Sequence, residues 1–332
     1  MTAQQRGDTT LINGTRRLGG LALAAMMFAA ACSSAGTSPT PAPTVAPTTA
    51  PTVAASTDTA VTPAPPTPTA APTLNCVAGS ITAAGSTALQ PLVDAAAKQY
   101  VKACSGSTIT VNGGGSGTGL TQVAGGSIQI GDSDVTAASK LSTPDANGLV
   151  DHIVARQGWI VVTNKDVTGV TNLTTQQNID VWTGKVTNWK SVGGPDLPIV
   201  LIFRPSSSGT RSTFKKLVLG GATEATGGQT LTEDSNGAVT TAITKTDGAV
   251  SVIGFAYYND PANKSLLNGL QLDGVDATVA NVSNASYKLA ADGHMYTKGA
   301  ATGLSAAFLN YMLGADVQGT LIPSLSYGPV AK

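Results

Sequence analysis

Histidine and cysteine are scarce in this chain of 332 residues, which contains two of the former and three of the latter. Enzymes that pair a nucleophile with a base, and metal sites of the zinc type, need several such side chains close together. His152 and His294 have neither a cysteine nor a nucleophile motif beside them. The sequence therefore predicts a protein that is not an enzyme and that needs no metal and no cofactor.

An excess of positive charge is also lacking. Lys and Arg number 19, Asp and Glu also number 19, and the formal net charge is zero. Nucleic-acid binding requires a basic face that attracts phosphate backbones. We therefore expect no nucleic acid among the partners of this protein.

No apolar run near the start is long enough to span a bilayer, because residues 18–31 make only about 14 apolar positions where roughly 20 are needed. Arginines precede this run and Cys32 follows it at once. The arrangement resembles a bacterial lipoprotein signal peptide, residues 1–31, with Cys32 as the lipid attachment site. An ordinary signal peptide remains the alternative, because Ala29 stands where leucine is usual. Arg16-Arg17 leaves export by the twin-arginine route open.

Residues 32–74 form a low-complexity segment rich in Pro and Thr, with ten of the eighteen prolines of the chain. Such a composition cannot bury a core, so we expect a disordered, lipid-anchored linker. Extended at about 3.1 Å per residue, it could reach on the order of 100 Å from the membrane. A glycosylated stalk is the alternative and would serve the same spacing purpose.

Cys76 and Cys104 remain once Cys32 is assigned to lipid. An even number of cysteines in an exported protein favours one disulfide, and two unpaired thiols are the alternative. Such a bridge would close a loop of about 29 residues and contribute roughly 3 to 4 kcal/mol to stability.

Short β-rich runs alternate with helical stretches from residue 75 to the end. An α/β fold with mainly parallel sheets follows from this alternation. The clearest helix comes after the first run, with apolar residues from Leu89 to Tyr100 at spacings of three and four, and Ser86 or Thr87 is its expected cap. The expected strands are 80–83, 108–111, 128–131, 159–163, 199–203 and 252–257.

Three segments place glycine and hydroxyl side chains between an expected strand and an expected helix: Gly85-Ser86-Thr87, 113–119 and 206–210. Helix N-termini expose unpaired N–H groups and partial positive charge, and glycine lets an anion approach them. One such turn is ordinary, but three in one α/β chain favour a converging anion site. The glycine-rich loop lacks the following lysine of a nucleotide-binding P-loop.

Two charged side chains refine this hypothesis. Arg204 ends the strand 199–203, from where its guanidinium could donate to an oxyanion, whereas Arg211 should point elsewhere. Asp134 follows the strand 128–131. Phosphate near neutral pH keeps a proton that a buried carboxylate accepts, but sulfate has no such proton and is repelled. We expect Asp134 to select phosphate in this way and Asp132 to be a solvated loop residue or a cap.

These segments carry a resemblance that covers residues 80–330. Together they are similar to the phosphate-binding proteins of high-affinity phosphate ABC importers, within the type II periplasmic-binding-protein fold. The supporting motifs are Ala84-Gly85-Ser86-Thr87, Gly115-Ser116-Gly117, Gly131-Asp132-Ser133-Asp134, the block 182–189, Arg204 with Ser208-Gly209-Thr210, and Ile253-Gly254-Phe255-Ala256-Tyr257.

The resemblance implies two lobes, each a mainly parallel sheet flanked by helices, joined by two crossover strands near residues 155–159 and 254–258. Lobe 1 would comprise residues 75–157 and 257–332, and lobe 2 residues 158–256. The tryptophans of the block 182–189 are expected in a packed turn rather than in a ligand platform. Tyr257 and Tyr258 are expected to pack at the hinge.

The resemblance also implies the ligand, inorganic phosphate, and its contacts. These fall on Thr87, Ala88, Ser116 and Asp134 in the first lobe and on Arg204, Ser208, Gly209 and Thr210 in the second. Ala88 departs from the family pattern, where an aromatic residue is frequent. Ser206 also departs, because many relatives have an acidic residue there that pairs with the arginine.

The implied function is an extracytoplasmic lipoprotein that captures phosphate and delivers it to the permease subunits of an ABC importer. A monomer is expected, held by Cys32 at the outer face of the cytoplasmic membrane. The alternatives are a receptor or sensor for another tetrahedral oxyanion, such as sulfate or arsenate, and a phosphate-ester hydrolase.

Overall fold

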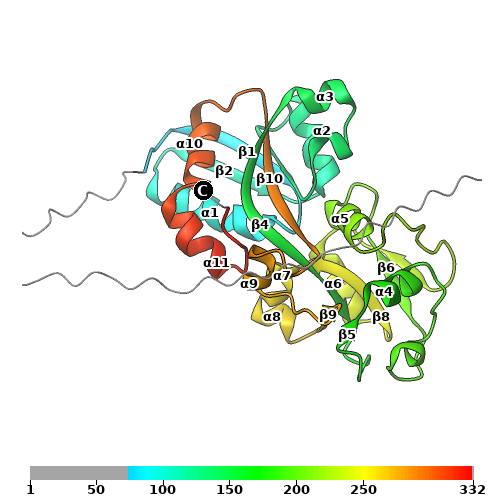
Figure 1. Cartoon of the computed structure of the whole chain (residues 1–332). Helices are drawn as coiled ribbons and strands as arrows, with labels where there is room; N and C mark the ends of the chain where they lie inside the picture. The colour runs from blue at the N-terminus through cyan, green and yellow to red at the C-terminus, as the bar shows by residue number, and fades with distance from the viewer. Residues whose placement is uncertain (1–73, 331–332) are drawn as a thin grey trace, which may run out of the picture. The chain divides into compact units, whose positions relative to one another are not determined.

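The computed structural model describes residues 74–330 (Figure 1). The predicted signal peptide, Cys32 and all but the last residue of the predicted linker lie outside this range. The strands are β1 (Gly79–Gly85), β2 (Ser107–Asn112), β3 (Ile130–Ser133), β4 (Leu149–Thr163), β5 (Asn172–Leu173), β6 (Val200–Phe203), β7 (Thr230–Thr232), β8 (Ala249–Gly254), β9 (Asn268–Leu272) and β10 (Ala290–Lys298).

Helices alternate with these strands, as the sequence predicts. The α-helices are α1 (Gln90–Ala103), α2 (Ser116–Gly125), α3 (Thr143–Asn147), α4 (Thr175–Trp182), α5 (Gly209–Leu217), α6 (Asn236–Thr244), α7 (Phe255–Asn259), α8 (Pro261–Lys264), α9 (Val279–Ser283), α10 (Gly303–Met312) and α11 (Ile322–Ser324). Shorter helical turns are η1 (Ala137–Ser139), η2 (Trp189–Val192) and η3 (Val317–Leu321).

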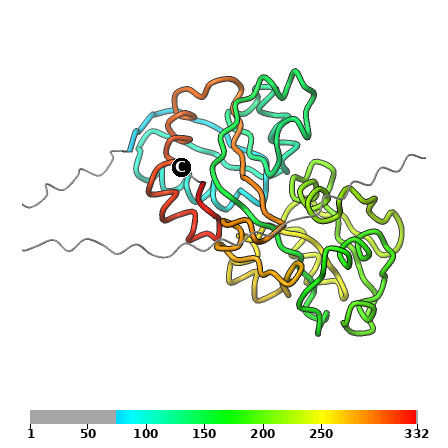
Figure 2. The backbone as a smooth tube through the Cα atoms, viewed as in Figure 1, coloured from blue at the N-terminus to red at the C-terminus, as the bar shows by residue number. Residues whose placement is uncertain are grey.

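The strands form one continuous sheet in the order β2-β1-β3-β10-β4-β8-β6-β7, with β5 and β9 paired beside it. Strand β4 connects its two halves, because residues 149–158 pair with β10 and residues 159–163 pair with β8. We call the part around β1, β2, β3 and β10 the first lobe and the part around β5 to β9 the second lobe. Figure 2 shows β4 in green and β10 in orange running side by side between them.

Parallel pairing places the loops of the candidate site at one edge in each lobe. In the first lobe β1 pairs in parallel with β2 and β3, so the segments after Gly85, Asn112 and Ser133 leave the same edge. In the second lobe β6 pairs in parallel with β8 and β7. Ligands of open α/β sheets bind beyond the carboxyl ends of the strands, where these loops lie.

Helix α1 buries the stripe that its sequence predicts. Four residues of this stripe are fully buried in the core of the first lobe: Leu92, Val93, Ala96 and Tyr100. The helix begins later than expected, with Leu89 as its N-cap residue. Ser86 still serves this end of the helix, because its Oγ accepts hydrogen bonds from the N–H groups of Ala88 and Leu89.

The second crossover lies elsewhere than predicted. Phe255–Asn259 is helix α7 and not a strand, although its aromatic residues favour strands by propensity. Tertiary packing decides here: Phe255 is buried, and Tyr257 and Tyr258 pack on the core of the second lobe. A proline at residue 261 then opens α8.

The predicted start of the returning first-lobe segment, residue 257, is also too early. Strand β9 pairs with β4 at residues 161–163 and with β5, both in the second lobe. Leu270 and Leu289 belong to the core of the second lobe as well. The chain therefore returns to the first lobe only as β10 begins.

The block 182–189 is a packed turn, as predicted. Trp182 is 3% exposed and contacts the rings of Phe203 and Phe214 edge-on. Trp189 is fully buried, and its Nε1 donates to the carbonyl of Gly248 at 2.9 Å. Both indoles thus stabilise the second lobe, and neither forms an open platform.

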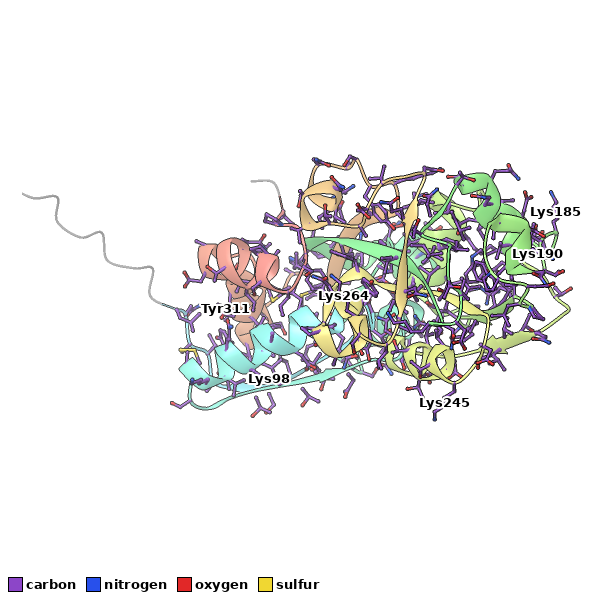
Figure 3. All side chains as sticks on the ribbon, turned by 90° about the horizontal axis from the view of Figure 1, so that it is seen from below. Lys98, Lys185, Lys190, Lys245, Lys264 and Tyr311 are labelled. Atoms are coloured by element: carbon purple, nitrogen blue, oxygen red, sulfur yellow. A yellow bond between two sulfur atoms is a disulfide. The ribbon has the colours of Figure 1, made fainter. Side chains whose placement is uncertain are left out.

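The first residues of the folded part are held by a disulfide. Cys76 and Cys104 are bonded, with Cα atoms 5.1 Å apart, which ties the chain before β1 to the end of α1. Within residues 74–330, no helix has the length and apolar character to cross a membrane. Lys98, Lys185 and Lys245 point outward from separate elements (Figure 3).

Candidate functional site

The eight predicted ligand residues come together between the two lobes. Those of the first lobe lie between β1 and α1, at the start of α2 and directly after β3, and those of the second lie between β6 and the first turn of α5. Hydrogen bonds join the two groups directly. The seven with side chains are all buried, with exposed fractions of at most 8%: Thr87, Ala88, Ser116, Asp134, Arg204, Ser208 and Thr210.

Asp134 is the most extensively hydrogen-bonded carboxylate of this site. Its Oδ1 accepts from Ser86 Oγ and from Gln157 Nε2 at 3.0 Å, and its Oδ2 accepts from Thr210 Oγ1 at 3.1 Å. The backbone N–H of Asp134 donates to Ser116 Oγ at 2.9 Å. Donors from both lobes and from β4 therefore fix this carboxylate in one orientation.

Two opposing effects act on the proton affinity of Asp134. Burial raises its pKa above the usual 3.8, because the charged form loses its hydration. The donors Ser86, Gln157 and Thr210 and the charge of Arg204 lower the pKa, but less than burial raises it. A carboxylate with a raised pKa is a strong acceptor for a proton that a ligand brings.

Arg204 enters the cleft from the second lobe with its guanidinium bound to neutral acceptors. Its Nε donates to the carbonyl of Glu233 at 3.0 Å, and its Nη2 donates to the carbonyl of Asp234 at 2.8 Å. Nη1 and Nη2 also reach Asn236 Oδ1 at 3.3 Å and Thr87 Oγ1 at 3.2 Å. Among residues 74–330 no carboxylate forms an ion pair with Arg204, which leaves its charge available to an anion.

Arg211 points away from the cleft, as its position on α5 predicts. Its Nε and Nη2 form an ion pair with Glu224, and its Nη1 donates to the carbonyl of Arg204 at 2.6 Å. The guanidinium also lies over the Phe203 ring, 5.6 Å from its centroid. Arg211 thus holds the strand end that carries Arg204.

Close packing of the two lobes requires glycine at the start of α5. A Cβ built on Gly209 would overlap Ser116 Oγ and lie 2.7 Å from the Asp134 Cβ. The N–H of Gly117 donates to the carbonyl of Ser207 at 2.8 Å, which joins the N-terminal ends of α2 and α5. The hydroxyl of Ser208 caps α5 by accepting from the N–H of Arg211. Two helix N-termini therefore meet at the site, where their dipoles favour an anion.

Three buried residues of this site escape sequence reasoning. Gln157 in β4 donates to Asp134, and Trp159 Nε1 donates to Thr210 Oγ1 at 3.1 Å. Asn236, the first residue of α6, donates from Nδ2 to the carbonyl of Thr87 at 2.8 Å and accepts from Arg204. Gln157 and Trp159 lie within a strand, away from any glycine- and hydroxyl-rich turn, whereas Asn236 stands between Ser235 and Gly237 at the start of α6, where a shorter form of that signal was present.

Asp132 differs from its expected position in solvent. It lies within β3 and not in the loop after it, and it is only 1% exposed. Neither of its carboxylate oxygens has a hydrogen-bond partner among the described residues. Burial, and then the charges of Asp134 and Asp94, raise its pKa from 3.8 to about 8. Burial therefore favours the neutral form of Asp132.

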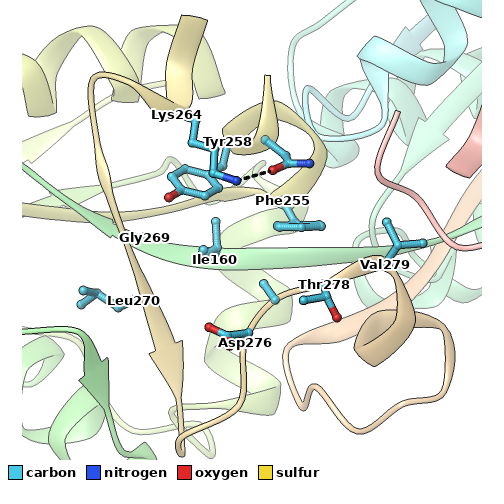
Figure 4. A pocket seen from close by; sticks show the side chains of 11 residues that line it. Ile160, Phe255, Tyr258, Lys264, Gly269, Leu270, Asp276, Thr278 and Val279 are labelled. Atoms are coloured by element: carbon cyan, nitrogen blue, oxygen red, sulfur yellow. Dashed lines mark hydrogen bonds between the residues drawn. The ribbon is translucent and has the colours of Figure 1, made fainter. Parts of the chain in front are cut away.

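A separate hollow of about 420 Å³ opens beside the hinge (Figure 4). Ile160, Phe255, Tyr258 and Asp276 are among its lining residues, and Lys264 Nζ donates to Asn259 Oδ1 at 3.0 Å on its rim. None of the eight predicted ligand residues lines it. Within residues 74–330 no group of three or more His, Cys, Asp or Glu side chains is placed to hold a metal ion.

This fold defines a two-lobed periplasmic-binding protein of type II. The sequence profile of the PBP superfamily domain matches residues 67–316. The phosphate-binding protein PstS of Bacillus subtilis is 43% identical over 252 residues, which cover 76% of this chain and 81% of that protein. The chain belongs to the PBP superfamily and, within it, to the family of these phosphate-binding proteins.

Solved structures agree with this assignment. A phosphate ABC transporter substrate-binding protein from Clostridium perfringens, with bound phosphate, matches at a TM-score of 0.68 and 28% identity, covering 76% of this chain and 100% of that one. An ABC-type phosphate transport receptor from Vibrio cholerae matches at a TM-score of 0.59 and 26% identity, and the match covers 76% of this chain and 100% of that one. These names describe substrate-binding proteins of transporters and not enzymes, and the predicted fold class is confirmed.

Proposed function

We propose that this protein captures inorganic phosphate between its lobes and delivers it to the permease of an ABC importer. The presence of Asp134 and Arg204 at one buried site, from opposite lobes, carries this proposal. A cation and a hydrogen-bond acceptor side by side fit an anion that still carries a proton. Homology to proteins named for phosphate binding supports the same ligand.

The recognition chemistry follows from the donors and the one acceptor of the cleft. Arg204 offers a charged donor, and the hydroxyls of Thr87 and Ser116 offer neutral ones, whereas Thr210 Oγ1 donates its proton to Asp134. The N–H groups of Gly209 and Thr210 would donate to the remaining oxygens. Those of Ala88 and Ser208 donate to Ser86 Oγ and to the carbonyl of Pro205, and they would exchange these partners for the ligand. Asp134 accepts the proton of hydrogen phosphate, whereas a sulfate oxygen would face it with lone pairs only and would be repelled.

Selectivity between the two anions thus depends on one buried carboxylate. An unmatched buried acceptor costs on the order of 1 to 3 kcal/mol, and every 1.4 kcal/mol is a tenfold change in affinity. The ligand is bound without covalent change, so the function requires neither a nucleophile nor a cofactor.

Transport requires the lobes to open and close around the ligand. Strand β4 and the start of β10 connect the lobes, which makes them the segments about which closure would occur. Lipid attachment at Cys32 and the linker of residues 32–74 would hold a monomer near the permease at the outer face of the cytoplasmic membrane. The cleft could then load with phosphate and dock repeatedly without leaving the membrane surface.

Calorimetric titration tests this function directly. The purified protein is first stripped of bound anion by reversible unfolding, and phosphate and then sulfate are added near neutral pH. We expect tight one-to-one binding of phosphate and no measurable binding of sulfate. Binding of sulfate alone would support a receptor for another oxyanion, and binding of neither would contradict the proposal.

A further inference from the structure

Lys140 extends from the first lobe to the second at the rim of the site. It follows η1, and its Nζ donates to the carbonyl of Ser206 at 2.6 Å and to Ser212 Oγ at 2.7 Å. The carbonyl of Ser208 lies 3.4 Å away. All three acceptors belong to the second lobe, in the loop before α5 and its first turn. Every hydrogen bond of this ammonium group therefore spans the two lobes.

The segment that carries Lys140 is fixed to the sheet of the first lobe. The N–H of Ala137 donates to Tyr296 Oη at 3.2 Å, and this hydroxyl in turn donates to Asp151 Oδ2 at 2.9 Å. His294 Nδ1 lies 3.0 Å from both oxygens of the same carboxylate. Because Tyr296 and His294 belong to β10, a movement of the lobes would stretch the bonds of Lys140 and not simply shift its loop.

The electrostatic surroundings of Lys140 are unusual for a structural lysine. A cation at a helix N-terminus faces the positive end of the helix dipole, which is unfavourable. Burial and the charge of Arg211 lower the pKa of Lys140, while Asp134 raises it. None of the ion pairs in the described part of the chain includes Lys140. Its charge is thus best compensated when an anion lies in the adjacent cleft.

We propose that Lys140 is a positioning residue that holds the lobes closed over the bound anion. This inference rests on the proposed function and adds to it a residue that controls ligand release. Its three acceptors are within reach only when the lobes are closed, so it should stabilise the closed, loaded state and leave the first encounter with phosphate nearly unchanged. Differences among related complexes lie mostly in dissociation rates, in keeping with this role.

Release of phosphate is the measurement that tests this role. The protein is loaded with radiolabelled phosphate, mixed rapidly with excess unlabelled phosphate and sampled for retained label, and association is followed separately. Lys140→Met keeps the length of the side chain but removes its charge and donors. We expect release to become about tenfold faster, since hydrogen bonds to a charged group are lost, with association within about threefold of the wild-type rate. Lys140→Arg should restore slow release, because it keeps the charge and the reach.

Lys102→Met is the matched control, because Lys102 is exposed at the far end of α1, and it should release phosphate like the wild type. Ser212→Ala removes one acceptor, and combined with Lys140→Met it forms a double-mutant cycle. The double variant should release phosphate no faster than Lys140→Met alone, because the two residues act through one contact.

Wild-type release rates in Lys140→Met would overturn the inference while leaving phosphate binding intact. Release from Lys140→Arg as fast as from Lys140→Met, or fully multiplicative effects in the cycle, would also overturn it. A wild-type protein that retains no phosphate would instead contradict the proposed function, and the role of Lys140 with it.

Discussion

Thr210 in the second lobe donates a hydrogen bond of 3.1 Å from its Oγ1 to Asp134 Oδ2 in the first lobe. The same hydroxyl accepts from Trp159 Nε1, in the strand that connects the lobes. One small side chain therefore joins both walls of the cleft and its hinge. This hydrogen bond can form only when the second lobe lies against the first. The position of the Asp134 carboxylate therefore depends on whether the lobes are closed.

Asp134→Asn should weaken the discrimination of phosphate from sulfate more than it weakens anion binding. The amide removes the negative charge that repels sulfate and replaces one acceptor oxygen with a donor. We expect the dissociation constant for sulfate divided by that for phosphate to fall at least about tenfold, which corresponds to about 1.4 kcal/mol. Competition titrations with both anions measure this ratio. Asp145→Asn on the exposed helix α3 is the control, and an unchanged ratio in Asp134→Asn would refute the proton-accepting role.

Arg204→Met should cost phosphate affinity on the order of 2 to 5 kcal/mol, because it removes a buried charge opposite the ligand. The phosphate affinity of Arg204→Lys should lie between those of Arg204→Met and the wild type, since lysine keeps the charge but loses the planar fork. Calorimetry gives the affinities, and urea unfolding of each variant shows whether the fold survives. Affinity of Arg204→Met within about threefold of wild type would mean that the neutral donors suffice.

Much of this site could be predicted from the sequence because its signals are local. Glycine and hydroxyl residues between a strand and a helix already specify an exposed helix N-terminus. The contacts of Asn236 with Thr87, 149 residues away, and of Lys140 with Ser212, 72 residues away, have no such local signal. They exist only because the two lobes fold against each other.

The errors in the fold have the same origin. Propensity favours a strand at Phe255 and its aromatic neighbours, but contacts to both lobes make this segment helix α7. Asp132 looked like a loop residue because acidic side chains are rarely buried. Its strand continues to Ser133, which places the carboxyl inside the first lobe.

Gly209→Ala should prevent the lobes from closing fully. The added Cβ would overlap Ser116 Oγ and crowd Asp134, while the helical position itself tolerates alanine. Overpacking of this kind costs about 1 to 3 kcal/mol, so we expect phosphate affinity to fall roughly tenfold or more with little change in unfolding free energy. Gly227→Ala is the matched control, because a Cβ there meets no atom within 4 Å. Equal affinities of the two variants would contradict the closed arrangement.

Asp132→Asn should change how the stability of the protein depends on pH. The pKa of Asp132 is raised from 3.8 to about 8 by burial and then by Asp134 and Asp94. Between these pH values the folded protein keeps a proton that the unfolded chain has lost. The stabilisation is therefore fully present below pH 3.8 and is lost as the pH rises through about 8, by at most about 1.4 kcal/mol per pH unit.

The amide of Asp132→Asn has no such proton to lose, so its unfolding free energy should fall less steeply with pH than that of the wild type. Urea unfolding of both proteins at about pH 5, 6.5 and 7.5 measures the difference between them. This difference cancels any constant effect of the substitution on packing. We expect the variant to gain stability relative to the wild type as the pH rises, and parallel pH profiles would show that the carboxyl of Asp132 does not hold a proton in the folded state.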